Sequence, residues 1–142
     1  MKVIIMRGLP GSGKSTWLNQ KEPTAMVCSA DDFFVTDEGV YLFDPKKLPQ
    51  AHQACMRKFL GALAQQVAVV AVDNTNISLW ECSPYVSVAE ALGYAVEVVR
   101  VDADPDICAA RNTHNVPIEA VRRMAARFEK SLPWWKERRA EV

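Results

Sequence analysis

The sequence predicts a single α/β domain over residues 1–142, a three-layer α/β/α sandwich built on a roughly four-stranded parallel sheet. Short runs of β-branched and other apolar residues alternate along the chain with segments of helical periodicity, which indicates repeated strand–helix units. The strand runs are apolar throughout, so helices should cover both faces of the sheet. Polar clusters follow three of the four runs, at the sheet edge where parallel α/β sheets bind ligands.

The first half of the chain contains two predicted strands and two predicted helices. Residues 3–6 form a short apolar run, followed by a glycine-rich turn and a helix over residues 15–20. A second strand is expected at residues 25–28. The helix predicted over residues 45–66 has one apolar stripe, with residues three and four apart at Leu48, Ala51, Cys55, Phe59 and Leu63.

The second half continues the alternation and ends in helices. Strands are expected at residues 67–72 and 95–101, and the helix between them should begin at Ser78, with Glu81 completing a capping box. A short helix then runs to Arg111. We expect a lid at about residues 111–117 and helices over 117–140, against which the two tryptophans of that segment, Trp134 and Trp135, should pack.

Composition and charge are those of an ordinary globular protein. Hydrophobic residues make up 49% and charged residues 24%, and no apolar run reaches the ~20 residues that a membrane span requires. Seventeen basic residues balance seventeen acidic ones, so no broad nucleic-acid surface and no membrane partner are expected. Four widely spaced cysteines without a Cys-x-x-Cys pair favour free thiols in a reducing cytoplasm.

Residues 8–15, Gly-Leu-Pro-Gly-Ser-Gly-Lys-Ser, match the phosphate-binding pattern G-x-x-x-x-G-K-[ST] without a mismatch. Glycine reaches the torsions that turn backbone N–H groups toward a phosphate, and the helix that follows adds its positive dipole end. The lysine supplies charge for the β- and γ-phosphates, and the serine offers a hydroxyl to Mg²⁺. The predicted ATP contacts are Gly8, Pro10, Gly11, Ser12, Gly13, Lys14, Ser15 and Thr16.

Carboxylates follow two of the other predicted strands. Asp31 and Asp32 come after the second strand and Asp73 after the third. Such residues often only form turns or cap helices. Next to a phosphate-binding loop, one of Asp31 and Asp32 is the predicted base for an acceptor hydroxyl, and Asp73 is predicted to hold Mg²⁺ or its water shell together with Ser15.

The polar turn after the third strand has two interpretations. Asn74 and Asn76 either close the turn or contact the acceptor. Asp32 is a further candidate for acceptor contact.

One arginine is placed to bind ATP phosphates. Arg111 stands at the end of a predicted helix, before the short loop 112–116. An arginine that stabilises the charge on a transferring phosphoryl group contributes ~10³–10⁵ in rate. The alternative is a cation that only stabilises the helix C-terminus. His114 is interpreted as a surface residue of the lid and His52 as structural.

Four segments in order resemble one family: RGLPGSGKST, SADDFF, VDNTN followed by WE-x-x-x-Y, and RN-x-H-x-V with a later M-x-x-R-F-E. Over roughly residues 1–130 the chain resembles the 5′-polynucleotide kinases and, more closely, the polynucleotide-kinase-like P-loop domains of Nedd4-binding-protein type. The resemblance implies a P-loop kinase fold with a small helical lid. It also implies that Asp31, in preference to Asp32, accepts the proton of a 5′-hydroxyl, that Asp73 supports the acceptor site, and that Arg111 grips the ATP phosphates.

Two positions depart from the family pattern. Polynucleotide kinases carry an arginine three residues after the catalytic aspartate, where it binds the acceptor's 3′-phosphate, and this chain has Phe34 there. A second lid arginine is replaced by the region of His114 in a shortened loop. Phe34 is therefore a candidate either for stacking on an acceptor base or for packing in the core.

The predicted function is transfer of the γ-phosphoryl group of ATP, with Mg²⁺, to a hydroxyl acceptor. The leading acceptor is the 5′-hydroxyl of DNA or RNA. The nearest alternative is a kinase of a nucleoside, a hydroxymethylated DNA base, a sugar or another small molecule. A nucleotide-dependent switch or binding module is the alternative from another class, although the Asn-Lys-x-Asp signature of guanine-specific switches is absent. No oligomeric state is predicted.

Overall fold

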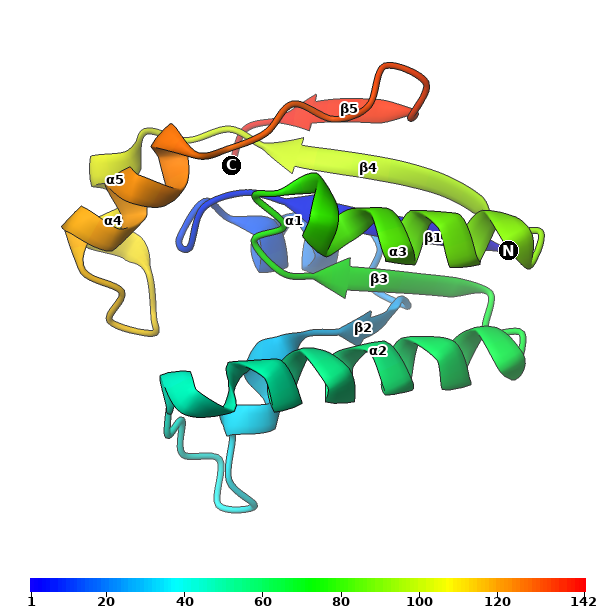
Figure 1. The fold of residues 1–142 in the computed structure, drawn as a ribbon, viewed down its shortest axis with the longest axis horizontal. Coiled ribbons are helices and arrows are strands. Elements are labelled where there is room, and N and C mark those ends of the chain that lie inside the picture. Colours follow the sequence, from blue (N-terminus) through cyan, green and yellow to red (C-terminus); the bar gives the residue numbers. More distant parts are fainter.

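The computed structural model describes residues 1–142, and its centre is a five-stranded parallel sheet (Figure 1). The strand order is β2-β3-β1-β4-β5, so β1 lies in the middle. The strands are β1 (Lys2–Arg7), β2 (Met26–Cys28), β3 (Val69–Asp73), β4 (Ala95–Val101) and β5 (Glu137–Ala140). Because every pairing is parallel, the carboxyl ends of the strands meet at one edge.

Helices cover both faces of the sheet. They are α1 (Lys14–Lys21), α2 (Leu48–Ala64), α3 (Leu79–Ala91), α4 (Pro105–Arg111) and α5 (Ile118–Ala126), with short 3₁₀ helices η1 (Ala30–Phe34) and η2 (Pro45–Lys47). In Figure 1, α2 and α3 lie in front of the sheet and α1 lies behind it. The predicted α/β/α sandwich is therefore confirmed.

Strand β1 shows why the sheet needs two layers of helices. All five residues from Val3 to Arg7 are buried. Val3 and Ile5 join the larger apolar cluster, which contains α2 and α3, whereas Ile4 and Met6 join the cluster built on Trp17 and Leu18 of α1. Burying these alternating side chains contributes about 1.5–3 kcal/mol each.

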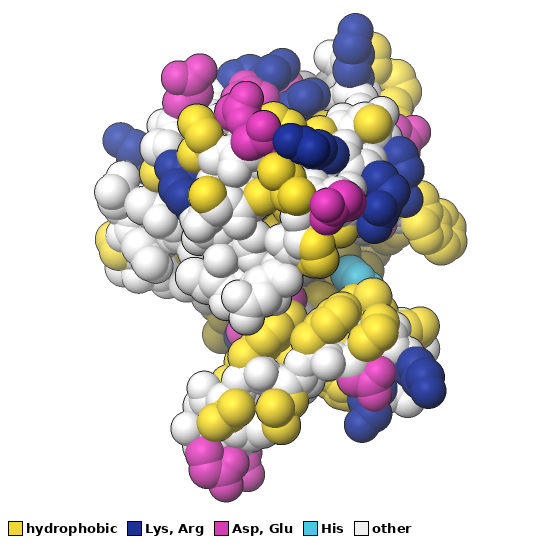
Figure 2. Space-filling view, turned by 90° about the vertical axis from the view of Figure 1, so that its left-hand side faces the viewer, with side chains coloured by type: hydrophobic (Ala, Val, Ile, Leu, Met, Phe, Trp, Pro, Cys, Tyr) yellow, Lys and Arg dark blue, Asp and Glu magenta, His cyan; other side chains and the backbone are white.

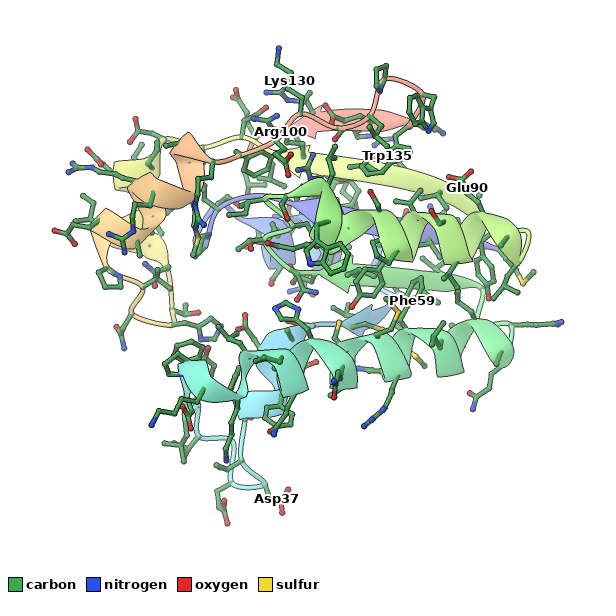
Figure 3. The ribbon with its side chains drawn as sticks, in the orientation of Figure 1. Asp37, Phe59, Glu90, Arg100, Lys130 and Trp135 are labelled. Atoms are coloured by element: carbon green, nitrogen blue, oxygen red, sulfur yellow. The ribbon has the colours of Figure 1, made fainter.

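The α2 stripe packs largely as its periodicity predicts. Phe59, fully buried, lies between α2 and the sheet and meets the ring of Tyr85 edge to face at 4.9 Å (Figure 3). Leu48, at the N-terminal end of the stripe, is instead partly exposed and lines the cavity described below.

The C-terminal segment corrects the prediction of helices over residues 117–140. Helix α5 ends at Ala126, and the chain returns to the sheet as β5, parallel to β4. This edge strand reads Glu-Arg-Arg-Ala, and its arginines pair with carboxylates on β4 and directly after it: Arg138 with Glu97 at 3.2 Å and Arg139 with Asp102 at 2.7 Å. No helix follows α5: Trp134 is 77% exposed, and Trp135 packs against the larger apolar cluster of the core instead.

A fully buried arginine ties this return segment to the turn after β3. Arg7 donates from Nε to the carbonyl oxygen of Asn76 at 2.7 Å and from Nη2 to those of Ile77 at 3.2 Å and Glu129 at 2.8 Å. Its guanidinium also lies 4.8 Å from the ring centre of Phe128. Burial lowers the pKa of Arg7, yet these acceptors satisfy its N–H groups.

Candidate active site

The loop between β1 and α1 is shaped by glycines that no other residue could replace without movement. Gly11 and Gly13 have φ angles of +82° and +105°. A Cβ on Gly11 would lie 2.2 Å from the carbonyl oxygen of Cys108 in α4. The loop is thus packed against the helix that leads into the lid, and both parts face one cavity.

Lys14 points back into this loop. Its Nζ donates to the carbonyl oxygens of Gly8 at 3.1 Å and Leu9 at 3.0 Å. Burial lowers the pKa of Lys14, while the carboxylates of Asp73 and Asp31 act in the opposite direction. A triphosphate that exchanged these neutral carbonyls for anionic oxygens would strengthen both hydrogen bonds.

A hydroxyl and a carboxylate meet beside the loop. Ser15, in the first turn of α1, donates from Oγ to Oδ2 of Asp73 at 2.7 Å. Asp73 is the last residue of β3, which pairs directly with β1. The parallel register therefore brings together two residues that are far apart in the sequence, as predicted.

The second carboxylate cluster lies on the turn after β2. Asp31 and Asp32 belong to η1, whose first amide, that of Ala30, donates to Oδ1 of Asn74 at 2.9 Å. Asn74 Nδ2 in turn donates to Sγ of Cys55 on α2 at 3.5 Å. Asn74 thus anchors η1 to β3, and it also lines the cavity described below.

Asp31 has two neighbours from segments that are distant in the sequence. Tyr41 donates from its hydroxyl to Oδ1 at 3.3 Å, and Nε2 of His114, from the lid, lies 3.5 Å from Oδ2. Burial, the charge of Asp31 and this hydrogen bond raise the pKa of Tyr41 to about 12. Tyr41 therefore remains a neutral donor at physiological pH, while the Asp31 side chain stays 52% exposed to the cavity.

Phosphate loop, carboxylates and lid surround a single cavity of about 820 Å³. Figure 2 shows the hollow from the lid side, between a large upper part and a smaller lower part whose rim is hydrophobic. Arg111 lines the cavity at the end of α4 and donates from Nη1 to the carbonyl oxygen of Val142 at 3.4 Å. Most of the predicted site residues meet here: Pro10, Gly11, Gly13, Lys14, Ser15, Thr16, Asp31, Asp32, Asp73, Asn74 and Arg111.

Four predicted contact residues, Gly8, Ser12, Phe34 and Asn76, lie outside the cavity lining. Ser12 is fully buried and its Oγ has no hydrogen-bond partner. Phe34 is only 5% exposed, so its ring packs in the core and is not available for stacking. Asn76 is buried and donates to the carbonyl oxygen of Met6 at 2.8 Å, which closes the turn after β3.

Sequence reasoning missed three cavity residues. Tyr41 was given no role, and neither was Phe43, although both lie in a stretch unusually rich in aromatic residues that follows the acidic pair. His52, which the sequence predicts to be structural, lies on the exposed side of α2 and lines the cavity. The aromatic-rich segment directly after the candidate catalytic carboxylates is the sequence feature that could have indicated these cavity residues.

Comparison with known protein families shows which family this chain belongs to. Residues 3–131 match the family described as an AAA domain. The chain belongs to that family. The human NEDD4-binding protein 2 is 33% identical to it over 135 residues, which cover 90% of this chain and 8% of that protein. The chain thus spans a small part of this relative's length.

Solved structures of the same fold include a sugar kinase, a gluconokinase and an APS kinase. A chain of the Pnkp1/Rnl/Hen1 RNA repair complex matches with a TM-score of 0.70 at 21% identity, over 89% of this chain and 43% of that one. A sugar kinase from Janibacter sp. HTCC2649 matches with a TM-score of 0.64 at 15% identity, over 98% and 84%. At such identities the likeness shows the fold alone, and the fold is that of P-loop kinases. None of the helices is both long and apolar enough to cross a membrane.

Proposed function

We propose that this protein transfers the γ-phosphoryl group of ATP to a hydroxyl acceptor, best the 5′-hydroxyl end of DNA or RNA. One observation carries the proposal: the ammonium-bearing phosphate loop and the Asp31 carboxylate line the same cavity from separate strands. A nucleotide switch needs only the first of these groups. A kinase needs both, because the acceptor hydroxyl must lose a proton as it attacks.

The phosphate loop forms the nucleotide side. Its glycines permit the tight turn, and Lys14 and Arg111 are the only lysine and arginine of the cavity lining. Lys14 would exchange the carbonyls of Gly8 and Leu9 for phosphate oxygens. Arg111 stands across the loop on the lid, where it can neutralise charge on the transferring group.

The oxygen atoms of Ser15 and Asp73 fit Mg²⁺. A hydroxyl and a carboxylate 2.7 Å apart at the phosphate loop are hard oxygen ligands, and Mg²⁺ typically takes one or two such protein ligands while phosphates and waters complete its shell. When bound, the ion supplies charge neutralisation for the phosphates. Ser15 and Asp73 are the residues that would hold the ion, through their side-chain oxygen atoms.

Asp31 performs the proton transfer. As the acceptor oxygen forms its bond to the γ-phosphorus, the bond from that phosphorus to the oxygen bridging the β- and γ-phosphates breaks, and ADP leaves with the electron pair. The acceptor's proton passes to the Asp31 carboxylate. The hydrogen bond from Tyr41 fixes the rotamer of that carboxylate so that one oxygen faces the cavity.

The acceptor class is supported by family likeness. Pnkp1 belongs to an RNA repair complex, and a chain of that complex shares the fold of this chain, which favours a nucleic-acid end. The sugar kinase among the structural neighbours favours a small-molecule acceptor instead. The four buried free cysteines fit a reducing cytoplasm as the place of action.

Transfer of label from γ-labelled ATP tests the proposal. The acceptor panel contains 5′-hydroxyl DNA and RNA strands, nicked duplex, nucleosides and sugars. Asp31→Asn should lower transfer by about 10²–10⁴-fold, the usual contribution of a general base, and leave ATP affinity unchanged. Asp37→Asn, at the tip of the loop that hangs away from the sheet (Figure 3), is the matched control and should retain full activity.

The results separate the alternatives. Full activity of Asp31→Asn would contradict the assigned base. Labelling of small molecules but of no strand would exclude the nucleic-acid acceptor. Nucleotide binding without any transfer would favour a switch or binding module.

A further inference from the structure

The acceptor side of the cavity lacks the cations that a phosphate would need. Besides the acidic pair, the lining includes Val35, Tyr41, Phe43, Leu48, His52 and His114, of which Tyr41 and His114 contact Asp31, and its only lysine and arginine are Lys14 and Arg111. Lys14 bonds to the phosphate loop and Arg111 reaches Val142, whose side chain packs against Gly13 of that loop. An acceptor phosphate close to Asp31 would meet carboxylates and apolar carbons, which disfavour it.

Aromatic rings build a wall on this side. Phe34, buried beneath, meets Phe43 at 5.0 Å and Tyr41 at 6.1 Å, both in edge geometry. The rings of Tyr41 and Phe43 are nearly parallel, with an interplanar angle of 16° and centroids 6.3 Å apart. Phe43 is 50% exposed. The buried phenylalanine thus holds two rings in a fixed orientation at the cavity surface.

A flat ring already occupies the face of this wall. The imidazole of His114 lies 4.0 Å from the ring of Tyr41, tilted by 35°, and its Nε2 is 3.5 Å from the Asp31 carboxylate. The space between Tyr41 and Asp31 therefore accepts a planar, polar ring that directs a hydrogen-bond donor toward the proposed base. His114 belongs to the loop between α4 and α5, so an entering ring would have to displace it from this position.

We infer that the acceptor is a nucleoside, free or at the end of a strand, whose base stacks on the wall formed by Tyr41 and Phe43. This inference rests on the proposed function and names the chemistry of its acceptor. The base replaces the His114 ring and the sugar hydroxyl takes the place of its N–H beside Asp31. Stacking on an aromatic side chain is strong and tolerant of base identity. Recognition thus shifts from the acceptor's phosphate to its base.

The test combines a substrate change with a side-chain change. The two probes are a 5′-hydroxyl oligonucleotide with a terminal adenine nucleotide and the same strand with an abasic terminal nucleotide. For the wild type, loss of the base should lower kcat/KM about tenfold or more, in line with the usual contribution of one stacked base. Tyr41→Leu should lower kcat/KM for the complete strand by a similar factor and should no longer distinguish the two strands.

Three controls isolate stacking. The KM for ATP should be the same in every variant, because the wall does not touch the phosphate loop. Tyr41→Phe keeps the ring and should keep the preference for the complete strand. Trp134→Leu removes an exposed aromatic ring far from the cavity and should behave as the wild type.

Several outcomes would overturn the inference. Equal kcat/KM for the two strands in the wild type would show that the base is not bound. A Tyr41→Leu enzyme that still prefers the complete strand would place stacking elsewhere. If adenosine is labelled and strands are not, kcat/KM for adenosine is compared with that for ribose, and equal values would likewise show that the base is not bound. Labelling of sugars alone would contradict the inference while leaving the kinase function intact, whereas no transfer to any acceptor would refute both.

Discussion

Replacing Arg7 by methionine tests whether the buried guanidinium holds the fold together. The change removes all the donors that Arg7 offers to the turn after β3 and to the segment after α5. The carbonyl oxygens of Asn76 and Glu129 have no other hydrogen-bond donor, whereas that of Ile77 still receives the amide of Glu129 at 2.8 Å. The buried carbonyl oxygen of Asn76 and the partly buried one of Glu129 are therefore left without a donor, and Oγ of Ser131 loses its hydrogen bond from Nη1 as well.

The expected cost follows from this count. Each unsatisfied buried carbonyl costs about 1–3 kcal/mol, and the apolar methionine recovers part of that sum because no charge has to be buried. We expect the free energy of unfolding to fall by about 2–4 kcal/mol. A domain of this size has about 5–15 kcal/mol in total, so the melting temperature should fall by roughly 10 °C.

Urea denaturation followed by tryptophan fluorescence measures the effect, since Trp17 is buried in the core. Arg100→Met is the control. Arg100 lies over the same Phe128 ring, at 4.3 Å, but is partly exposed and makes only an ion pair with Asp102, so its loss should cost about 1 kcal/mol or less. If the free energy of unfolding fell equally in the two variants, the contact of a guanidinium with the Phe128 ring would account for the effect. The hydrogen bonds of Arg7 would then not be what holds the turn after β3 and the segment after α5 together.

Three further outcomes are expected. Gly11→Ala should abolish nucleotide binding, measured by calorimetry, because its Cβ would clash with the carbonyl oxygen of Cys108. Gly61→Ala, on α2 with open space around it and no positive φ, should bind normally. Nucleotide affinity should fall as pH rises through the lowered pKa of Lys14, hence below 10.5, because the neutral amine no longer attracts phosphate; an unchanged affinity up to that pH would contradict this. Burial raises the pKa of Cys28 to about 11, so a thiol reagent at pH 8 should label it only after unfolding, and rapid labelling of Cys28 in the folded protein would disprove its burial.

The fold and the nucleotide side of the site could be predicted because their signals are local. The motif at residues 8–15 specifies its own turn, and the apolar runs specify buried strands. Parallel pairing then determines that Asp73 ends beside Ser15, since β3 neighbours β1. No knowledge of distant contacts was needed for this part.

The remainder depends on contacts between distant segments. Strand β5 contains almost no apolar residue, and its pairing relies on charges on β4 that periodicity does not reveal. Ser78 does precede α3, but no side-chain capping bond forms there; the amide of Leu79 instead donates to Oε1 of Glu129 at 2.9 Å. The meeting of Tyr41 and His114 at Asp31 likewise joins two loops whose positions only the complete fold determines.

Because β2 lies at the edge of the sheet, the residues for acceptor choice and those for ATP binding are held by different parts of the fold. The phosphate loop follows the central strand, where neighbours on both sides hold it, whereas the turn carrying Asp31 follows a three-residue strand that pairs only with β3. Exchanging residues 29–47 for the matching segment of another P-loop kinase therefore disturbs only one boundary of the sheet. We expect such a chimaera to have the acceptor preference of the kinase that supplied the segment. Its affinity for ATP should remain that of the present protein.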